Sequence, residues 1–212
     1  MGTDISEFYL ANVRLSYLYC FEPYVPPASA QNPRPKATYR LHALLAPSDP
    51  QLKALAEKIE QIGSAHAWKG GVTWAEVKEQ LKGKDRLCLH KGEVSQPGKP
   101  EYKGMYYLSG NRDAPFTVVD ADRTPLRGNE TPRRPVSGDW GNVYFSIYAQ
   151  DNQWGRGINA TITGLQFVKQ DAAFGSGPAP KDPTEFGIVN AASADAPPPA
   201  AGAADPLAGL VG

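Results

Sequence analysis

The longest alternation of apolar and polar residues in this chain lies within residues 139–169, and it constrains the fold more than any other stretch. Its first half places apolar residues at every second position, which puts them on one face of a β-strand: Val143, Phe145, Ile147 and Ala149. A turn rich in asparagine, aspartate and glycine follows, and a second alternating run starts at Ile158. The two runs predict an antiparallel hairpin with one buried face and one outer face.

Gly164 interrupts the second run, and Leu165 and Phe167 become the apolar positions after it. A glycine that shifts the alternation in this way predicts a β-bulge, which bends a strand and helps a sheet to close. Such bending is typical of a small barrel.

The rest of the chain adds shorter strands and two helices. Alternation predicts strands in residues 7–24 and 37–46 and three short extended pieces in 85–119. A helix is expected over 50–62, and another over 73–83, which starts with the capping-box spacing TWAE. We therefore predict a mainly β fold with inserted helices, an OB-type five-stranded Greek-key barrel. Periodicity alone leaves a β-sandwich as an alternative.

Composition divides the chain into a domain and a tail. Residues 1–175 are predicted to form one OB-fold domain, and residues 176–212, rich in alanine, proline and glycine, a flexible and disordered tail. The whole chain has zero net charge, but the tail holds four acids and one base, so the domain carries +3 and the tail −3. The chain lacks an apolar run of the roughly 18 residues that a membrane span needs, and its first residues do not resemble a secretory leader. With only two cysteines, a cytoplasmic protein is expected.

Aromatic residues outside the predicted core are the candidates for binding bases. Flat rings stack on bases and nearby cations neutralise phosphates, which is how single-stranded nucleic acid is held without sequence preference. The candidate stacking residues are Tyr144, Tyr148, Trp154, Trp140, Tyr17 and Tyr106.

Several of these aromatic residues have an equally simple structural explanation. Tyr17 shares its alternating face with Val13, so packing in the core is an equal alternative for it. Tyr106 and Tyr107 must point to opposite sides of one strand, so one of the two should be buried. Trp154 lies in a glycine-rich turn, where it could equally anchor the loop.

Basic residues supply the candidate contacts to phosphates. These are Arg14, Lys36, Arg40, Arg112, Arg156, Arg133 and Arg134. Arg14 and Arg40 alternate with core positions, which favours an outward direction for both side chains. The stretch 120–138 has little apolar content, and we interpret it as an exposed basic loop. For each single cation, an ordinary solvated surface position is the alternative.

Residue types that carry chemistry occur without the spacing that chemistry needs. The cysteines and histidines at Cys20, His42, Cys88 and His90 lack the paired spacing of a zinc site, and the aspartates of 120–151 lie in turn-like sequence. Hydrolase, phosphate-loop and metalloprotease motifs are also missing. We expect no catalytic residue, no metal and no cofactor, and hence a protein that is not an enzyme.

Four segments, taken in order, resemble a family of tailed-phage proteins: VRLSYLYCFEP, KATYRLHALL, GMYYLSGNRDAPFTVVDAD and GDWGNVYFSIYAQDNQWGRGINATITGLQFVK. The family consists of single-stranded DNA-binding proteins with an OB fold, and the resemblance covers residues 7–170. The sequence departs from the family pattern at LCLHKGE, where a more acidic segment is usual, and in its mildly charged tail.

The resemblance implies a protein that coats and protects single-stranded DNA during phage replication or recombination, largely independently of sequence. It also implies phage replication proteins as partners through the C-terminal tail, in the cytoplasm of the host. A carbohydrate-binding or adaptor β-module is the alternative, because aromatic surfaces also stack on sugars, and a metal-dependent nuclease is a third possibility. The salt dependence of affinity distinguishes the DNA-binding hypothesis from the carbohydrate-binding or adaptor hypothesis, because only binding to phosphates releases counterions.

Overall fold

The structure is a computed structural model of the 212-residue chain, and it describes residues 5–29, 34–81, 86–128 and 134–174. Its strands are β1 (Ile5–Tyr24), β2 (Thr38–Leu45), β3 (Leu89–Lys91), β4 (Tyr106–Arg112), β5 (Thr117–Val119), β6 (Trp140–Asn152) and β7 (Gly155–Lys169). Its α-helices are α1 (Pro50–Ala65), α2 (Trp74–Leu81) and α3 (Gly92–Ser95), and 3-10 turns lie at Lys69–Gly71 and Pro100–Tyr102. Arg133 and the predicted tail at 176–212 lie outside the described residues.

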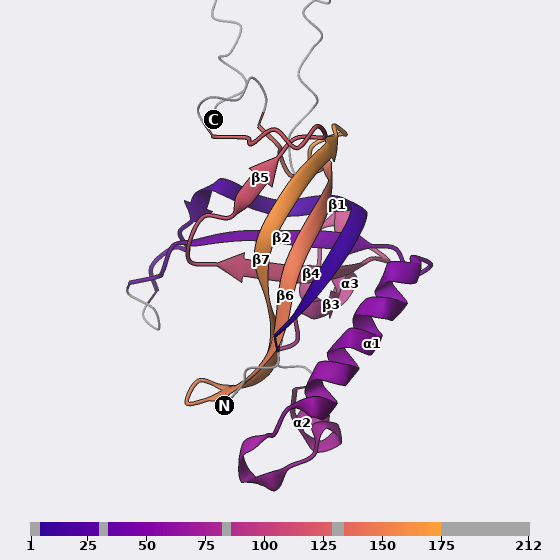
Figure 1. The fold of residues 1–212 in the computed structure, drawn as a ribbon, viewed down its shortest axis with the longest axis vertical. Coiled ribbons are helices and arrows are strands. Elements are labelled where there is room, and N and C mark those ends of the chain that lie inside the picture. Colours follow the sequence, from indigo (N-terminus) through magenta and orange to yellow (C-terminus); the bar gives the residue numbers. More distant parts are fainter. Residues whose placement is uncertain (1–4, 30–33, 82–85, 129–133, 175–212) are drawn as a thin grey trace, which may run out of the picture. The chain divides into compact units, whose positions relative to one another are not determined.

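The strands form one sheet that closes on itself. Their order is β3-β4-β2-β1-β6-β7-β5, and every pairing is antiparallel except that of β5 with β7. Residues 86–88 join β4 to β7, because the Ser109 amide donates to the Cys88 carbonyl and the Cys88 amide donates to the Ile158 carbonyl, both at 2.8 Å. In Figure 1, β6 and β7 run across β1, β2 and β4. The prediction of a mainly β fold with inserted helices is confirmed, with β1, β2, β4, β6 and β7 as the five barrel strands and β3 and β5 as short additions.

The long strand β1 serves both halves of the barrel because it bends twice. Its N-terminal half pairs with β6 and its C-terminal half with β2. Two register shifts fall around Asn12 and Tyr17, whose φ angles are 50° and 47°, and a third lies between Tyr19 and Tyr24. The second shift exchanges the two faces of the strand. Alternation continued from Val13 and Tyr17 predicts that Tyr19 faces the core and that Cys20 faces outward. It holds as far as Leu15 and then fails, because Cys20 is buried and Tyr19 lies half-exposed on the outer side.

The predicted hairpin is present as β6 and β7. All four alternating positions of β6 are buried, as are Ile158, Ala160 and Ile162 of β7. Tyr144 pairs with Gly164 whereas the next residue, Phe145, pairs with Ile162, so the predicted bulge at Gly164 is confirmed. The apolar faces of the two strands form the middle of the core.

The two predicted helices begin where their capping residues stand. Asp49 accepts a hydrogen bond from the Gln51 amide at 2.9 Å at the start of α1. At α2, the Thr73 amide donates to Glu76 Oε2 at 2.7 Å and the Glu76 amide donates to Thr73 Oγ1 at 3.3 Å, which is the predicted capping box.

Helix α1 runs through Gly63, where the sequence predicted its end. A side chain at Gly63 would place Cβ 2.4 Å from the Trp74 ring, so glycine here makes room for the packing of α2 rather than ending a helix. Trp68 stacks on Trp74 with ring centroids 5.7 Å apart, and both side chains are buried. Figure 1 shows α1 beside the barrel with α2 at its C-terminal end. None of the described helices is long and apolar enough to cross a membrane.

Candidate nucleic-acid interface

Three tyrosines surround one arginine on the outer side of β1 and β2. The Arg40 guanidinium carbon lies 3.6 Å from the ring centroid of Tyr24 and 5.2 Å from those of Tyr17 and Tyr19. The rings of Tyr19 and Tyr24 contact each other, with centroids 5.1 Å apart. We call these four residues the tyrosine–arginine cluster. Cations at such distances from aromatic rings are attracted by about 0.5–2 kcal/mol.

The bulge in β1 builds this cluster. The register pairs Tyr19 with Arg40 and Tyr24 with Thr38, so the two tyrosines flank the arginine across the ladder. Without the shift at Tyr17, regular alternation would have turned Tyr19 towards the core. The sequence therefore predicted Arg40 and Tyr17 as candidates and missed Tyr19 and Tyr24, because the bulge has no glycine to signal it.

Arg40 has an unusual lack of polar partners. Its Nε is buried and donates no hydrogen bond, and within the described residues no carboxylate lies at ion-pair distance from its guanidinium. A buried donor without an acceptor costs about 1–3 kcal/mol. An anion bound at the cluster would therefore meet a cation that no carboxylate of the described residues neutralises.

Further cations lie close to the cluster. Lys99 Nζ is 5.4 Å from the centroid of the Tyr17 ring. Lys36, in the segment before β2, forms an ion pair with Asp113 in which both side chains are mostly exposed. An exposed pair contributes only about 0–1 kcal/mol, so Lys36 can exchange Asp113 for a phosphate at small cost.

The sheet beside the cluster carries a row of stacked aromatic rings. His42 stacks on Tyr107 with centroids 4.4 Å apart, and Tyr107 in turn stacks on His90 at 4.7 Å. Burial lowers the pKa of His42 to about 3, and the nearby His90 and Arg40 charges add to this effect. His42 is therefore neutral at physiological pH, and its Nδ1 is hydrogen-bonded to the hydroxyl of Tyr102 at 2.7 Å. The positive charge of this surface comes from Arg40 and the lysines.

A second aromatic surface lies on the outer side of β6, as the alternation predicted. Tyr144 is 51% exposed and its ring lies 4.6 Å from that of Tyr9, which is 43% exposed and stands opposite it in β1. Tyr148 is half-buried on the same face. We call this the Tyr9–Tyr144 face. Tyr9 was missed, although its alternation with the core residue Leu10 would have placed it outside.

Trp140 and Arg14, both predicted, come together near the end of the described chain. The Trp140 centroid lies 5.7 Å from the Arg14 guanidinium carbon and 4.9 Å from Lys169 Nζ. Arg14 also donates to the carbonyls of Gly138 and Ala172, both at 2.9 Å. These contacts use Nε and Nη2 of the Arg14 guanidinium, and Nη2 also lies 3.5 Å from a carboxylate oxygen of Asp171.

The β6–β7 turn carries the most exposed large aromatic residue of the described chain. Trp154 is 72% exposed, and Arg86 donates to its carbonyl at 3.1 Å. Arg156 donates to the Lys69 carbonyl at 2.6 Å and forms an ion pair with Asp151 at 3.5 Å. The indole of Trp154 is thus available to a ligand, whereas Arg156 helps to fix the turn.

The remaining predicted residues are dispersed. Arg112 donates to the Ile162 carbonyl at 3.3 Å. Tyr106 is half-buried and its neighbour Tyr107 is buried. One of the two tyrosines is therefore buried, as the alternation predicted. Arg134 forms an ion pair with Glu22 at 3.2 Å. The contacts therefore do not join all the candidates into one surface: Tyr17 and Arg40 share one group, Tyr144 and Tyr148 another, and Trp140 and Arg14 a third.

The cysteines and histidines do not assemble into a metal site. Over the described ranges, no group of three or more histidine, cysteine, aspartate or glutamate side chains is placed to hold a metal ion. Cys20 and Cys88 are both buried, and burial raises the pKa of each thiol to about 12.

A five-strand barrel with rings and cations on the outer side of its first two strands belongs to the class of OB-type barrels, which bind oligonucleotides or oligosaccharides on an open face of the barrel. Residues 6–196 match the family described as the single-stranded DNA-binding protein of Enterobacter phage Enc34, and the chain belongs to this family. The predicted family resemblance is therefore confirmed.

Individual relatives and solved structures are similar to this chain. Protein p50 of Acyrthosiphon pisum secondary endosymbiont phage 1 is 29% identical over 174 residues, which cover 79% of this chain and 86% of that protein. A C-terminally truncated Enc34 single-stranded DNA-binding protein has a similar structure, with a TM-score of 0.62, 25% identity, and coverage of 79% of this chain and 88% of that one. The Enc34 protein in complex with single-stranded DNA gives a TM-score of 0.64 at 24% identity, covering 80% and 89%.

Proposed function

We propose that this protein binds single-stranded DNA, with the tyrosine–arginine cluster at the centre of its binding surface. The observation that carries the proposal is Arg40, a cation framed by three tyrosine rings and left without a carboxylate among the described residues. Rings that stack on bases beside cations that attract phosphates are the two components of a single-strand site.

The bound strand runs from this cluster along the neighbouring loops. In OB barrels the face of the second and third strands is flanked by the loops before the second strand and between the last two strands. Here those loops carry Lys36 and the exposed Trp154. The Tyr9–Tyr144 face supplies a second, separate aromatic surface on β1 and β6. Stacking on ring faces is tolerant of sequence, so we infer binding largely independent of base identity.

Family membership supports DNA as the ligand, because the Enc34 relative has been solved with single-stranded DNA. The protein acts by binding rather than by chemistry, and it coats exposed strands in phage replication or recombination. Residues 176–212 recruit phage replication proteins in this proposal, through their acidic side chains.

The test is a titration of a fluorescent oligothymidine at several salt concentrations, with a duplex of equal length for comparison. Binding should favour the single strand and weaken as salt rises. Tyr19→Ala with Tyr24→Ala should lower affinity about five-fold or more, since one stacked base contributes about 1–3 kcal/mol. Tyr19→Phe with Tyr24→Phe is the matched control, because it keeps both rings. Affinity that ignores salt, or equal affinity for the duplex, would refute the proposal.

A further inference from the structure

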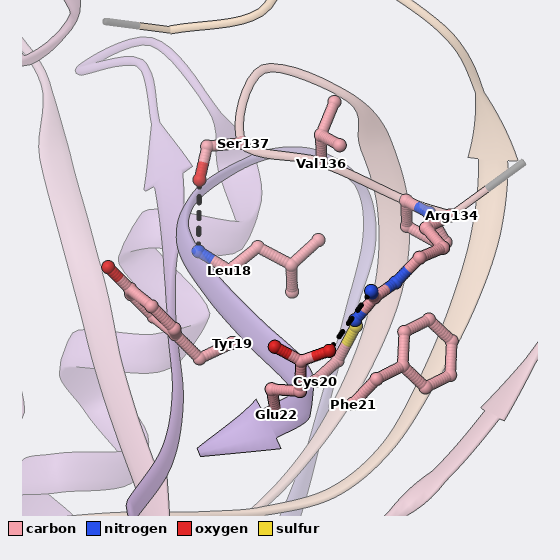
Figure 2. Close-up of a pocket in the computed structure, with 9 residues that line it drawn as sticks. Leu18, Tyr19, Cys20, Phe21, Glu22, Arg134, Val136 and Ser137 are labelled. Carbon is pink, nitrogen blue, oxygen red and sulfur yellow. Dashed lines mark hydrogen bonds and ion pairs between the residues drawn. The ribbon is translucent and has the colours of Figure 1, made fainter. Parts of the chain in front are cut away.

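A cavity of about 300 Å³ lies along the C-terminal half of β1, on the edge away from β2. One wall is formed by Leu18–Glu22, and the other by the segment 134–137 (Figure 2). Its volume is at the small end of the range of about 300–1,000 Å³ that ligand sites occupy, which suits a single ring system.

The cavity exists because a backbone ladder stops. The Leu15 amide donates to the Asp139 carbonyl at 2.9 Å, and the Gly138 amide donates to the Leu15 carbonyl at 2.7 Å. The next contact is already irregular, since the Leu18 amide donates to the Ser137 side chain at 3.0 Å rather than to a carbonyl. Beyond Leu18, backbone hydrogen bonds between β1 and 134–137 are absent from the described residues.

Strand geometry places one set of backbone groups in this gap. In a β-strand, alternate residues direct their N–H and C=O to the same edge. Leu18 faces the 134–137 segment, so Cys20 faces it too, while Tyr19 pairs with Arg40 on the other edge. By this alternation from Leu18, we infer that the Cys20 N–H and C=O, one donor and one acceptor side by side, lie on the edge that borders the cavity.

Both ends of this short edge are closed. The Leu18–Ser137 hydrogen bond blocks one end, and the Arg134–Glu22 ion pair at 3.2 Å blocks the other. Arg134 also lies 5.4 Å from the centroid of the Phe21 ring. Only about three residues of edge remain, whereas an added peptide strand usually spans about five or six. The cavity is therefore suited to a compact ligand rather than to an extended peptide.

We propose that this cavity receives one nucleobase of the bound strand. The Cys20 backbone would hydrogen-bond the donor–acceptor edge of the base, and Leu18, whose side chain extends into the cavity in Figure 2, would contact the ring. Arg134 stands at the rim, where the phosphate of that nucleotide would lie. Tyr19 lines the cavity, and its ring belongs to the tyrosine–arginine cluster, so the two sites share one residue of β1. The inference rests on the proposed single-strand binding.

The experiment combines a variant that fills the cavity with oligonucleotides that each lack one base. A set of oligothymidines, each with one abasic position, is titrated against the full-length protein and against Leu18→Phe. In the unmodified protein, the abasic position that faces the cavity should lower affinity about five-fold, the lower limit of a stacked base. Leu18→Phe should bind the intact oligonucleotide more weakly by a similar factor. The same abasic position should then cause no further loss of affinity in this variant. Leu52→Phe in α1, also a half-buried leucine at the border of the core, is the matched control and should bind like the unmodified protein.

The possible outcomes are distinct. If Leu18→Phe unfolds early, Arg134→Gln tests the rim of the same cavity and should show the same loss of position dependence. Additive effects of the variant and every abasic position would overturn the nucleobase site while leaving the proposed function intact. Loss of a protein partner with DNA binding unchanged would assign the cavity to a peptide and also overturn it. Failure of the unmodified protein to bind any oligonucleotide would refute the proposed function itself.

Discussion

Arg40 allows the proposed binding surface to be tested with a single charge. Arg40→Gln removes the cation but keeps a polar side chain of similar length, and Arg40→Lys keeps the charge but loses the planar group. Arg123→Gln removes one positive charge from an exposed loop and is the matched control. The three variants separate charge, shape and general electrostatics.

The size of the effect follows from the environment of the guanidinium. A hydrogen bond to a charged group contributes about 1.5–3 kcal/mol, and because Arg40 is only half-buried we expect the lower end, a loss of about ten-fold in affinity for Arg40→Gln. The slope of log affinity against log salt should fall in magnitude by about 0.7, the value for one phosphate on a single strand. Arg40→Lys should keep the slope and lose only a few-fold, since an ammonium cannot lie flat at 3.6 Å from the centre of the Tyr24 ring.

Folding stability should respond differently from binding. Arg40→Gln loses attraction to the rings, about 0.5–2 kcal/mol, but it also removes the Nε donor that is buried without a partner. The two terms oppose each other, so the free energy of unfolding in urea should change by no more than about 1 kcal/mol. Affinity is measured by fluorescence anisotropy between low and physiological salt. An unchanged salt slope in Arg40→Gln, or an equal change in Arg123→Gln, would show that Arg40 does not contact phosphate.

Two further predictions concern other parts of the barrel. Replacing Tyr144 and Tyr148 together by alanine should weaken strand binding about five-fold or more while the thermal midpoint changes little, because both side chains lie on the outer face; normal affinity with earlier melting would assign them to packing. The pKa of Glu60 is lowered below its ordinary value by the hydrogen bond from Lys78, with a further contribution from the indole N–H of Trp74. Glu60 therefore stabilises the fold above pH 4.5 and loses this contribution as pH falls through its lowered folded value, so the stability difference between the unmodified protein and Glu60→Gln should shrink on acidification in urea melts. A difference that is constant with pH would contradict this origin.

The parts of the fold that could be predicted are those in which local pattern and tertiary packing agree. Apolar and polar residues alternate in the β6–β7 hairpin without interruption until Gly164, and the glycine itself indicates the bulge at this point. The capping residues Asp49 and Thr73 satisfy amides within their own helices, so three or four residues of sequence suffice to locate them. The end of α1 was predicted wrongly at Gly63. A glycine is needed there because the Trp74 ring of α2 leaves no room for a side chain, and the local sequence does not reveal this contact.

The candidate site was predicted less completely for a related reason. Tyr19 and Tyr24 gain their position from a bulge at a tyrosine, and β-branched or bulky residues rarely adopt positive φ. Alternation carried past that point assigns the wrong face to every following residue, as happened for Tyr19 and Cys20. Arg40, which lies on the regular strand β2, was placed correctly by the same rule.

The strained backbone at Tyr17 then has a physical explanation in the surface that it creates. A residue in a sparsely populated φ/ψ region costs about 1–3 kcal/mol and persists only if its surroundings hold it there. The Tyr17 ring contacts His42 at 4.9 Å, and its hydroxyl is bonded to Gln96 at 3.1 Å, so the residue is fixed at both ends of its side chain. Because the bulge exchanges the faces of β1, it buries Cys20 and at the same time turns Tyr19 towards Arg40. One irregular residue thus completes the core on one side of the strand and builds the aromatic surface on the other, which is why the two cannot be altered independently at this position.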